Sequence, residues 1–404
     1  MTNRVLFLSH EASRTGAPIM LLSVQRWLRR NDSVSFRTVT ASPGELTGEF
    51  AMLGRVDSAE PGDVLYRVTR RVGMHRFLRS IHLAHLQESL SRERFGLVYV
   101  NSIASGRLLE RLPVGDCEVI CHVHELAGAI RSVGLKNLAA LERRRPRYIA
   151  VSDAVRDCLI GEFDIAPHRI HVVEPFIPEL EDGCADAEDA RISLAHELNI
   201  SPDVSIVCGC GTIEARKGTD LFIEVARQVA GGVNGRNVQF LWVGGASDKV
   251  KSMQDRLKSE APTAPVRFVG RKADVDRYFA ASDVFLLTSR EEAFGLVVLE
   301  AARRSKPTIC FDASDAARRF VEPDAGFSVA RFDVGEMSRR VMEFLSSPSL
   351  REQMGRAARR KFETRHTPAQ GGRAIATLIQ EAMGRRSGAT SVNAPPGKRE
   401  VRAE

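Results

Sequence analysis

Two glutamates, Glu292 and Glu300, bracket the segment whose residue types are best suited to ligand binding or catalysis. Glu292 lies in a turn after the apolar run 284–287, and Glu300 lies about two turns into the helix that the next residues predict. A turn from a strand into a helix presents free backbone N–H groups and a partial positive charge, which suit a phosphate that Gly295 would let approach closely. The carboxylates could hold sugar hydroxyls. Spacing alone leaves open that Glu300 is a surface residue and Glu292 a helix cap.

A second strand-to-helix loop, at 208–218, carries several glycines and two adjacent cations. Arg216 and Lys217 stand just before the predicted helix at 220–229, where they could bind a diphosphate. The loop is not a P-loop, because the Gly-Lys-Ser/Thr order is absent, and it lacks the third glycine of a dinucleotide fingerprint. A basic loop in which glycine only forms the turn is the alternative.

Two histidines lie at the end of a predicted strand in the first half of the chain. His122 and His124 share one face of that strand, because side chains alternate with a period of two. With Cys121 nearby they could hold a metal, but no later set of cysteines and histidines has ligand spacing. No Asp-x-Asp signature stands out either. We therefore expect no required metal and no other cofactor. The plain alternative to a metal site is that the two histidines are packed or capped residues at the end of a strand.

These residues must be positioned by an alternation of short β-branched runs with longer helical patterns, which indicates parallel sheets with right-handed crossovers. The alternation pauses in an acidic stretch near 181–203 and then restarts. We expect an α/β protein of two Rossmann-like, doubly wound parallel-sheet domains that face each other across a ligand-binding cleft. The predicted strands are Val5–Leu8, Ser35–Thr40, Leu97–Asn101, Val119–His124, Tyr148–Val151, Val204–Gly209, Val238–Val243, Val266–Val269, Val284–Leu287 and Thr308–Phe311.

The same pattern gives domain bounds. The predicted parts are an N-terminal domain at 1–180, a connection at 181–203, a C-terminal domain at 204–365, a final helix at 366–384 and a disordered tail at 385–404. A long helical pattern also covers 64–92. Trp242 lies in an apolar strand, which favours core packing over base stacking.

Composition narrows the class of protein. The 404 residues are 43% hydrophobic and carry a formal net charge of +7. No apolar run approaches the roughly 18 residues of a membrane span, and no signal cleavage site follows the first strand, so we expect a cytoplasmic protein with free thiols. Nucleic acid is not an expected partner, because aromatics are only 6% and no aromatic–basic stripe occurs. Arg67, Arg71, His75 and Arg79 share a helical face that could dock peripherally on anionic lipid at the inner membrane face, or simply be solvated.

The segment 289–301 closely resembles the glutamate–seven–glutamate motif of retaining glycosyltransferases with the two-Rossmann-domain (GT-B) fold, particularly family four, the glycosyl transferases group 1. In that family the first glutamate contacts the donor sugar and the second the ribose. The resemblance implies these roles for Glu292 and Glu300. It also implies that backbone amides at Leu296 and Val297 meet the diphosphate.

Other family positions can be matched one by one. Lys217 matches the phosphate-binding lysine, while Thr212 stands where many members have arginine, a charge that Arg216 could supply instead. Gly16 matches the glycine of a loop that approaches the donor phosphates and the acceptor. Arg271, with its neighbour Lys272, follows a strand at a turn that lies beside the nucleotide base in the family; an exposed basic turn is the alternative.

The resemblance spans about residues 4–365 and implies an enzyme. It would move a sugar from a nucleoside-diphosphate sugar to a glycan, lipid-linked or small-molecule acceptor in polysaccharide or glycoconjugate biosynthesis. Donor binding is implied for the C-terminal domain and acceptor binding for the N-terminal one, with the final helices crossing back. His124, which precedes an acidic residue as in the family, joins Glu292 as a catalytic candidate that contacts the sugar or the acceptor. The alternatives are a nucleotide-sugar epimerase and a non-catalytic sugar-nucleotide or glycan-binding protein on the same fold.

Overall fold

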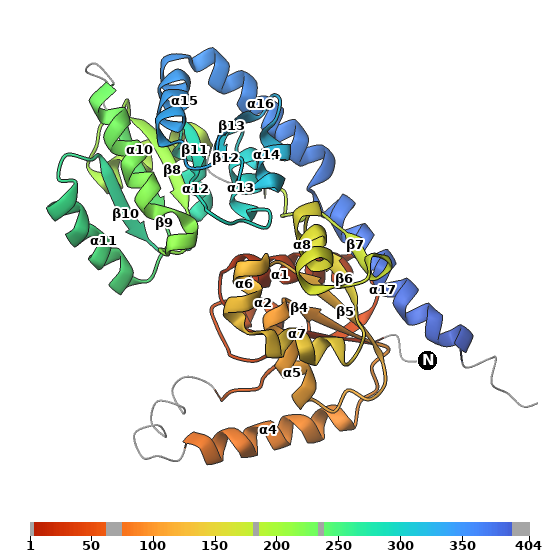
Figure 1. The fold of residues 1–404 in the computed structure, drawn as a ribbon. Coiled ribbons are helices and arrows are strands. Elements are labelled where there is room, and N and C mark those ends of the chain that lie inside the picture. The colour runs from red at the N-terminus through yellow and green to blue at the C-terminus, as the bar shows by residue number, and fades with distance from the viewer. Residues whose placement is uncertain (1–3, 62–74, 181–185, 233–237, 390–404) are drawn as a thin grey trace, which may run out of the picture.

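A computed structural model describes residues 4–61, 75–180, 186–232 and 238–389 of the chain. They form two α/β domains, each a parallel sheet with helices on both faces (Figure 1). The predicted fold class of two Rossmann-like, parallel-sheet domains is therefore confirmed. Arg67, Arg71 and Cys184 lie outside the described residues.

The N-terminal domain has, in its described residues, a sheet of seven parallel strands in the order β3-β2-β1-β4-β5-β6-β7. The strand order reverses between β1 and β4, which is where doubly wound sheets bind their ligands. The strands are β1 (Arg4–Ser9), β2 (Ser35–Thr40), β3 (Arg55–Ser58), β4 (Leu97–Asn101), β5 (Glu118–Val123), β6 (Arg147–Ala150) and β7 (Ile170–Val172). The helices are α1 (Gly16–Arg30), α2 (Thr47–Leu53), α4 (His75–Ser91), α5 (Gly106–Arg111), α6 (Ala127–Val133), α7 (Leu135–Glu142) and α8 (Asp153–Phe163).

The C-terminal domain repeats the plan, and its described residues form six parallel strands in the order β10-β9-β8-β11-β12-β13. Here the order reverses between β8 and β11. The strands are β8 (Ser205–Cys210), β9 (Val238–Val243), β10 (Val266–Gly270), β11 (Val284–Leu287), β12 (Thr308–Phe311) and β13 (Gly326–Val329). The helices are α9 (Ala187–Leu198), α10 (Thr219–Gly232), α11 (Ser247–Glu260), α12 (Val275–Ala281), α13 (Leu296–Arg303), α14 (Asp315–Val321), α15 (Val334–Ser346), α16 (Pro348–Arg365) and α17 (Pro368–Ala389).

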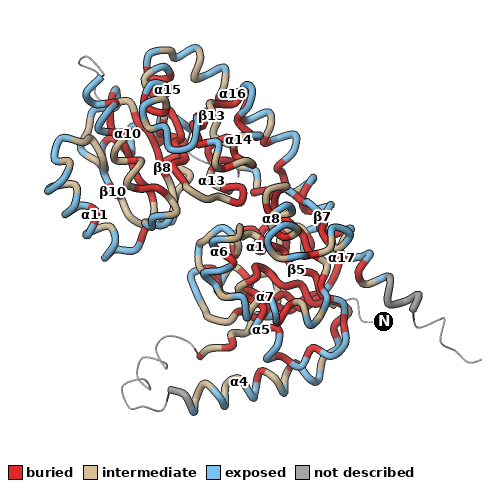
Figure 2. Tube along the Cα trace, viewed as in Figure 1, coloured by how far each residue is buried: buried red, intermediate tan, exposed pale blue. Residues whose placement is uncertain are grey.

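Each sheet separates two apolar cores. In β1, Leu6 and Leu8 enter one buried cluster while Val5 and Phe7 enter another, because successive side chains point to opposite faces. A strand covered on both faces must be apolar along its whole length, which is why such strands read as continuous hydrophobic runs. Figure 2 shows the result, with buried strands enclosed by helices whose outer faces are exposed. In the second sheet, Trp242 of β9 is only 2% exposed, so its predicted core packing is confirmed.

The last two helices join the domains. α16 packs against α13 of the C-terminal domain, and α17 crosses to pack on α1 of the N-terminal domain (Figure 1). Ile375 and Ile379 of α17 are fully buried in the same core as β1. The fit is close: a Cβ added at Gly372 would lie 2.4 Å from the Trp27 ring.

Several predicted boundaries are corrected. The short strands β3, β7 and β13 were not predicted, because each spans only three or four residues and carries few apolar ones. The helical pattern predicted at 64–92 is confirmed as α4 from His75 to Ser91, and residues 64–74 lie outside the described residues. α17 continues to Ala389, so residues 385–389, which were predicted as part of a disordered tail, are helical. α9 lies inside the expected connection, yet it buries Ala190 in the C-terminal core.

Two further properties concern the described residues as a whole. None of their helices combines the length and apolar character needed to cross a bilayer. No disulfide joins the six cysteines among them.

Candidate active site

Loops from the carboxyl ends of both sheets meet at the domain junction. Gly16, the first residue of α1, faces Leu296, the first residue of α13, and a Cβ added at Gly16 would lie 3.8 Å from Leu296 Cδ1. Ser152, at the start of α8, donates from Oγ to the carbonyl of Ala293 at 2.7 Å. Two helix N-termini, one from each domain, therefore converge at one place, and both carry partial positive charge.

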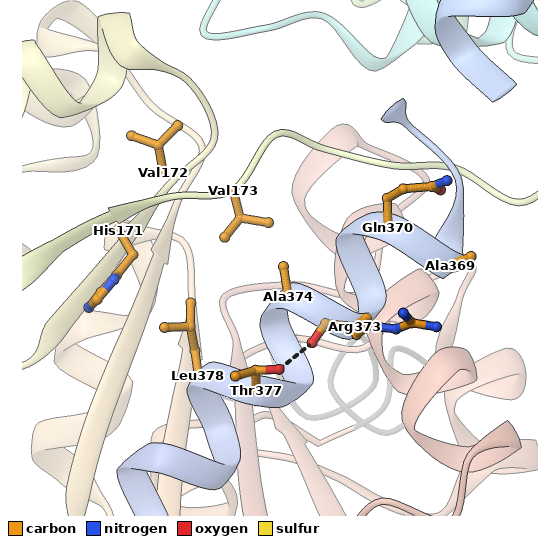
Figure 3. A pocket seen from close by; sticks show the side chains of 9 residues that line it. All are labelled: His171, Val172, Val173, Ala369, Gln370, Arg373, Ala374, Thr377 and Leu378. Atoms are coloured by element: carbon orange, nitrogen blue, oxygen red, sulfur yellow. Dashed lines mark hydrogen bonds between the residues drawn. The ribbon is translucent and has the colours of Figure 1, made fainter. Parts of the chain in front are cut away.

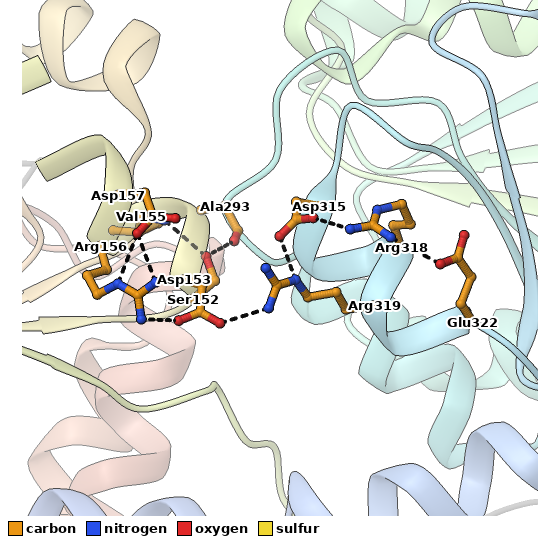
Figure 4. A network of polar contacts seen from close by, with 10 residues as sticks. All are labelled: Ser152, Asp153, Val155, Arg156, Asp157, Ala293, Asp315, Arg318, Arg319 and Glu322. Atoms are coloured by element: carbon orange, nitrogen blue, oxygen red, sulfur yellow. Dashed lines mark hydrogen bonds and ion pairs between the residues drawn. The ribbon is translucent and has the colours of Figure 1, made fainter. Parts of the chain in front are cut away.

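Ion pairs on either side hold the same junction. Asp153 of α8 pairs with Arg319 of α14 at 2.9 Å, within a wider polar network (Figure 4). Arg271, which follows β10, pairs with Glu45 of the N-terminal domain at 3.2 Å. Arg271, which was predicted to lie beside the nucleotide base, is thus exposed at the edge of the junction and forms an ion pair with the opposite domain.

Glu292 and Lys217 form an ion pair at the centre of the site. Their side chains are only 11% and 14% exposed, and Ser289 Oγ donates to Glu292 Oε2 at 3.2 Å. Burial raises the pKa of the Glu292 carboxyl, but Lys217, Arg216 and the hydrogen bonds together hold that pKa below its usual value. Glu292 is therefore ionised at neutral pH, and the two predicted residues are brought into direct contact.

Glycines let the two loops of the C-terminal domain pack this closely. Gly218 has a φ of 66°, and a Cβ there would lie 2.0 Å from the carbonyl oxygen of Thr288. Thr288 Oγ1 in turn donates to the Lys217 carbonyl at 3.1 Å. Only glycine allows this approach without strain, so the β8–α10 loop delivers Lys217 beside the loop that carries Glu292.

Arg216 and Thr212 share one acceptor. Arg216 Nη2 and Thr212 Oγ1 donate to the same carboxylate oxygen of Glu214, at 2.8 and 2.9 Å. Arg216 Nη1 also donates to the carbonyl of Glu291 at 3.2 Å. The guanidinium therefore lies beside Thr212, the position at which the family resemblance implies an arginine.

The start of α13 offers an anion site with a carboxylate behind it. Gly295 has a φ of 86°, and the first amides of the helix, at Leu296 and Val297, have no intrahelical acceptor. Glu300, one turn further on, is half-buried beside Cys208 and Cys210, and burial raises its pKa. Its carboxylate accepts no hydrogen bond and forms no ion pair within the part of the chain that the structure describes.

His124 lies just past β5 in a hydrogen-bonded chain that defines its tautomer. Asn101 Nδ2 donates to the carbonyl of Ala17 in α1 at 3.0 Å, so Asn101 Oδ1 faces His124 Nε2, at 2.9 Å. Nε2 must therefore carry the proton, and Nδ1 is left as an acceptor. Burial, together with His122 and His10, holds the pKa of His124 well below its usual range, so the ring is neutral at physiological pH.

The neighbouring histidine has a different surrounding. His122 is fully buried, stacks on His124 with ring centroids 4.3 Å apart, and shares a hydrogen bond of 2.7 Å with Tyr99. It is a packed residue of the strand end. Across the described ranges, no group of three or more His, Cys, Asp or Glu is placed to hold a metal ion.

Other features lie away from this site. Arg79, the described cation of the basic helical face, pairs with Glu60 at 2.6 Å. A cavity of about 580 Å³ opens between β7 and α17 on the outer side of the N-terminal domain (Figure 3), and it includes none of the predicted site residues. Its lining consists of His171, Val172, Val173, Ala369, Gln370, Arg373, Ala374, Thr377 and Leu378.

Sequence reasoning missed Asn101, Ser152 and Glu291. Asn101 and Ser152 follow or end strands of the predicted sheet, a position at which polar side chains commonly face a ligand. That signal could have found them. Glu291 carries no such signal, because the hydrogen-bond donor to its carboxylate, the Ala129 N–H, belongs to the opposite domain.

Two family models match most of the chain. The model described as Glycosyl transferases group 1 matches residues 192–361, and the model described as Glycosyltransferase Family 4 matches residues 17–179. Alpha-D-kanosaminyltransferase of Streptomyces kanamyceticus is 22% identical over 349 residues, covering 84% of this chain and 86% of that protein. D-inositol 3-phosphate glycosyltransferase of Gordonia bronchialis is 29% identical over 235 residues, which cover 55% of this chain and only 50% of that relative.

Solved structures show the same fold. Anabaena HepE, crystallised with UDP and glucose, superposes with a TM-score of 0.74 at 18% identity, covering 93% of this chain and 99% of that one. WaaG, a glycosyltransferase involved in lipopolysaccharide biosynthesis, has a TM-score of 0.68 at 17% identity with the same coverages. The family matches, the two-domain architecture and the paired glutamates agree, and the chain belongs to the GT-B glycosyltransferases of the glycosyl transferases group 1 family.

Proposed function

We propose that this enzyme transfers a sugar from a nucleoside-diphosphate sugar, with retention at the anomeric carbon, to a hydroxyl of a glycan, lipid-linked or small-molecule acceptor. The observation that carries the proposal is the Lys217–Glu292 ion pair beside the start of α13. A cation and helix amides suit a diphosphate, and an adjacent ionised carboxylate suits sugar hydroxyls. Anabaena HepE, which has this fold, has been solved with UDP and with UDP-glucose.

Each side chain has a proposed task in donor binding. Lys217 and Arg216 neutralise the diphosphate together with the amides of Leu296 and Val297, and these cations do the work for which other enzymes use a metal ion. Glu300 is half-buried and lacks a partner in the described residues, so its carboxylate is available to accept hydrogen bonds from the ribose hydroxyls. Glu292 accepts from hydroxyls of the donor sugar.

The transfer step needs no protein nucleophile. The bond between the anomeric carbon and the diphosphate oxygen breaks, and the acceptor oxygen bonds to that carbon on the same face. The acceptor proton passes to the departing phosphate oxygen. The ring of His124 is neutral, and its Nδ1 carries a free lone pair. This nitrogen orients a hydroxyl of the donor sugar or of the acceptor substrate by accepting a hydrogen bond from it.

A nucleotide screen tests the donor half of the proposal. Uridine, guanosine and adenosine diphosphates are each added to the purified protein, and the melting temperature is followed. A ligand at a hundred times its Kd stabilises a fold by about 2.7 kcal/mol, so the cognate diphosphate will raise the melting temperature, with or without EDTA. If none of the three raises it, the donor assignment is wrong.

The stereochemistry is tested on the product. With the stabilising nucleotide as guide, the corresponding sugar donors are incubated with hydroxyl acceptors, and proton NMR reads the anomeric configuration. Retention is expected. A product of opposite configuration, or a donor sugar altered at C2 without transfer, would contradict the proposal.

A further inference from the structure

The loop that carries Glu292 is held from both sides by the N-terminal domain. On one side, the Ala293 carbonyl accepts from Ser152 Oγ at 2.7 Å, in a buried contact. On the other side, Glu291 Oε1 accepts from the backbone N–H of Ala129, in the first turn of α6, at 3.3 Å. Glu292 therefore lies between two residues that are both bonded to the opposite domain.

The contact between Glu291 and α6 leaves no room for a methyl group at Gly128. A Cβ added at Gly128 would lie 2.4 Å from Glu291 Oε2. The glutamate carboxylate thus occupies the space above the start of α6, where the free N–H groups and the helix dipole favour negative charge. On the donor side, Arg216 Nη1 donates to the Glu291 backbone carbonyl, so the same residue contacts the phosphate-binding loop.

We propose that Glu291 is a positioning residue: its contact with α6 makes the placement of Glu292 depend on how the two domains are arranged. This inference rests on the proposed function, because it assigns Glu291 a task in the same transfer. Within the described residues, the Glu292 carboxylate forms no hydrogen bond or ion pair with the N-terminal domain; its partners are Lys217 and Ser289, both in the C-terminal domain. The N-terminal domain therefore reaches Glu292 through its two neighbours in sequence, Glu291 and Ala293.

The physical reason is the steep dependence of catalysis on geometry. A misplacement of a catalytic group by about 1 Å can cost on the order of a hundredfold in rate. The proposed nucleotide contacts come from Lys217, Arg216, Glu300 and the amides of α13, all within the C-terminal domain. Loss of the Glu291 contact should therefore lower kcat and leave the affinity for nucleoside diphosphate nearly unchanged.

Two substitutions break the same contact from opposite domains. Glu291→Ala removes the carboxylate. Gly128→Ala displaces it, at low cost to the fold, because the clashing atom is the end of a flexible side chain. Glu291→Gln keeps an oxygen that can accept from Ala129 and should behave much like the parent protein. Gly161→Ala, in α8 with no atom within 4 Å of the added methyl, is the matched glycine control.

Activity gives the first readout. We expect Glu291→Ala and Gly128→Ala each to lower kcat by about tenfold, while the Kd of the diphosphate that stabilises the parent protein stays within about twofold. In the double variant the Gly128→Ala effect should vanish, since no carboxylate remains to displace. A kcat equal to the parent in both single variants overturns the inference, as does a Gly128→Ala effect that is undiminished without Glu291.

Hydrogen exchange gives a readout that needs no substrate. Amide exchange in residues 288–296 should become faster in Glu291→Ala and in Gly128→Ala, and remain at the parent rate in Glu291→Gln and Gly161→Ala. Unchanged exchange in all four variants overturns the contact's role in holding the loop. If the parent protein neither binds a nucleoside diphosphate nor transfers sugar, the proposed function fails while this measurement still decides the inference.

Discussion

At the scale of residues, the site is built from groups whose charge states are set by their neighbours. Glu292 is ionised although it is almost buried, because Lys217 lies against it. His124 is neutral because it is buried and its Nε2 proton is directed at Asn101. One strong acceptor anion and one neutral acceptor nitrogen therefore flank the junction, a combination suited to holding sugar hydroxyls.

Lys217→Met tests the ion pair through stability. Removing one partner of a buried pair costs about 3–5 kcal/mol. In the parent protein the lowered pKa of Glu292 gives stability that is present above its unfolded pKa and lost as pH falls through the folded pKa. In the variant, burial raises the pKa of Glu292 by more than the remaining cation, Arg216, lowers it. The loss of stability caused by the substitution should therefore be smaller at low pH, where the carboxyl is protonated.

Urea unfolding of both proteins checks this sign. The difference in free energy of unfolding should be smaller at about pH 5 than at about pH 8. An equal difference at both pH values would mean that Glu292 is not the buried charge that Lys217→Met leaves without a partner.

Asn101→Asp tests the tautomer of His124. A carboxylate 2.9 Å from Nε2 favours the imidazolium form, so the pKa of His124 should rise. NMR of isotope-labelled histidine reads the titration directly. In the parent protein His124 should show no titration between about pH 6 and pH 8. A parent ring that titrates in this interval, or a variant whose pKa does not rise, contradicts the assigned hydrogen bonds.

At the scale of elements, turns from strands into helices place most of the site residues. The β8–α10 loop brings Lys217, and the β11–α13 loop brings Glu292 and the helix amides. α13 begins sharply because Gly295 adopts a left-handed conformation, and its buried face is Val298, Leu299, Ala301 and Ala302. The helix thereby points its N-terminus at α1.

Gly295→Ala tests this start of α13. A non-glycine residue with a φ of 86° costs about 1–2 kcal/mol, and the added Cβ would lie 3.2 Å from Glu292 Cγ. We expect lower stability in thermal unfolding and a lower kcat. Gly161→Ala, inside helix α8 with open space around it, should instead gain up to about 1 kcal/mol. Equal stability of the two variants would argue against the left-handed turn.

The elements that sequence could predict are those with long, continuous patterns. β1 and β9 are apolar along their whole length, so both the strands and the two-domain fold followed from them. β3 and β7 could not be predicted, because an edge strand needs few apolar residues and pairs on one side only. Within the site, the spacing of Glu292 and Glu300 was readable. The contact of Glu291 with Ala129 was not, because it joins residues 162 positions apart in different domains.

At the scale of the whole molecule, the C-terminal helix α17 connects the two domains. α17 comes last in sequence but packs on α1 and shares the core of β1. The junction between the domains adds Ser152–Ala293 and Asp153–Arg319. The relative placement of the domains, on which the site depends, is therefore secured at two separated places.

Ile375→Ala tests the crossing helix. A fully buried isoleucine cut to alanine costs about 2–5 kcal/mol. The loss should appear in the N-terminal domain, as faster amide hydrogen exchange in β1, although residue 375 follows the whole C-terminal domain. Thr377→Ala, on the exposed side of the same helix, should stay within about 0.5 kcal/mol of the parent. Faster exchange confined to the C-terminal sheet would contradict the packing.

The most direct test of the central claim compares nucleotide binding with sugar transfer in Glu292→Gln. The amide has the shape of the carboxylate but not its charge, so the stabilising nucleoside diphosphate should still bind, with a Kd within about threefold of the parent value. Transfer, measured as nucleoside diphosphate released in the presence of acceptor, should fall by about a hundredfold or more. An unchanged turnover in this variant would contradict the assignment of Glu292 to the reaction.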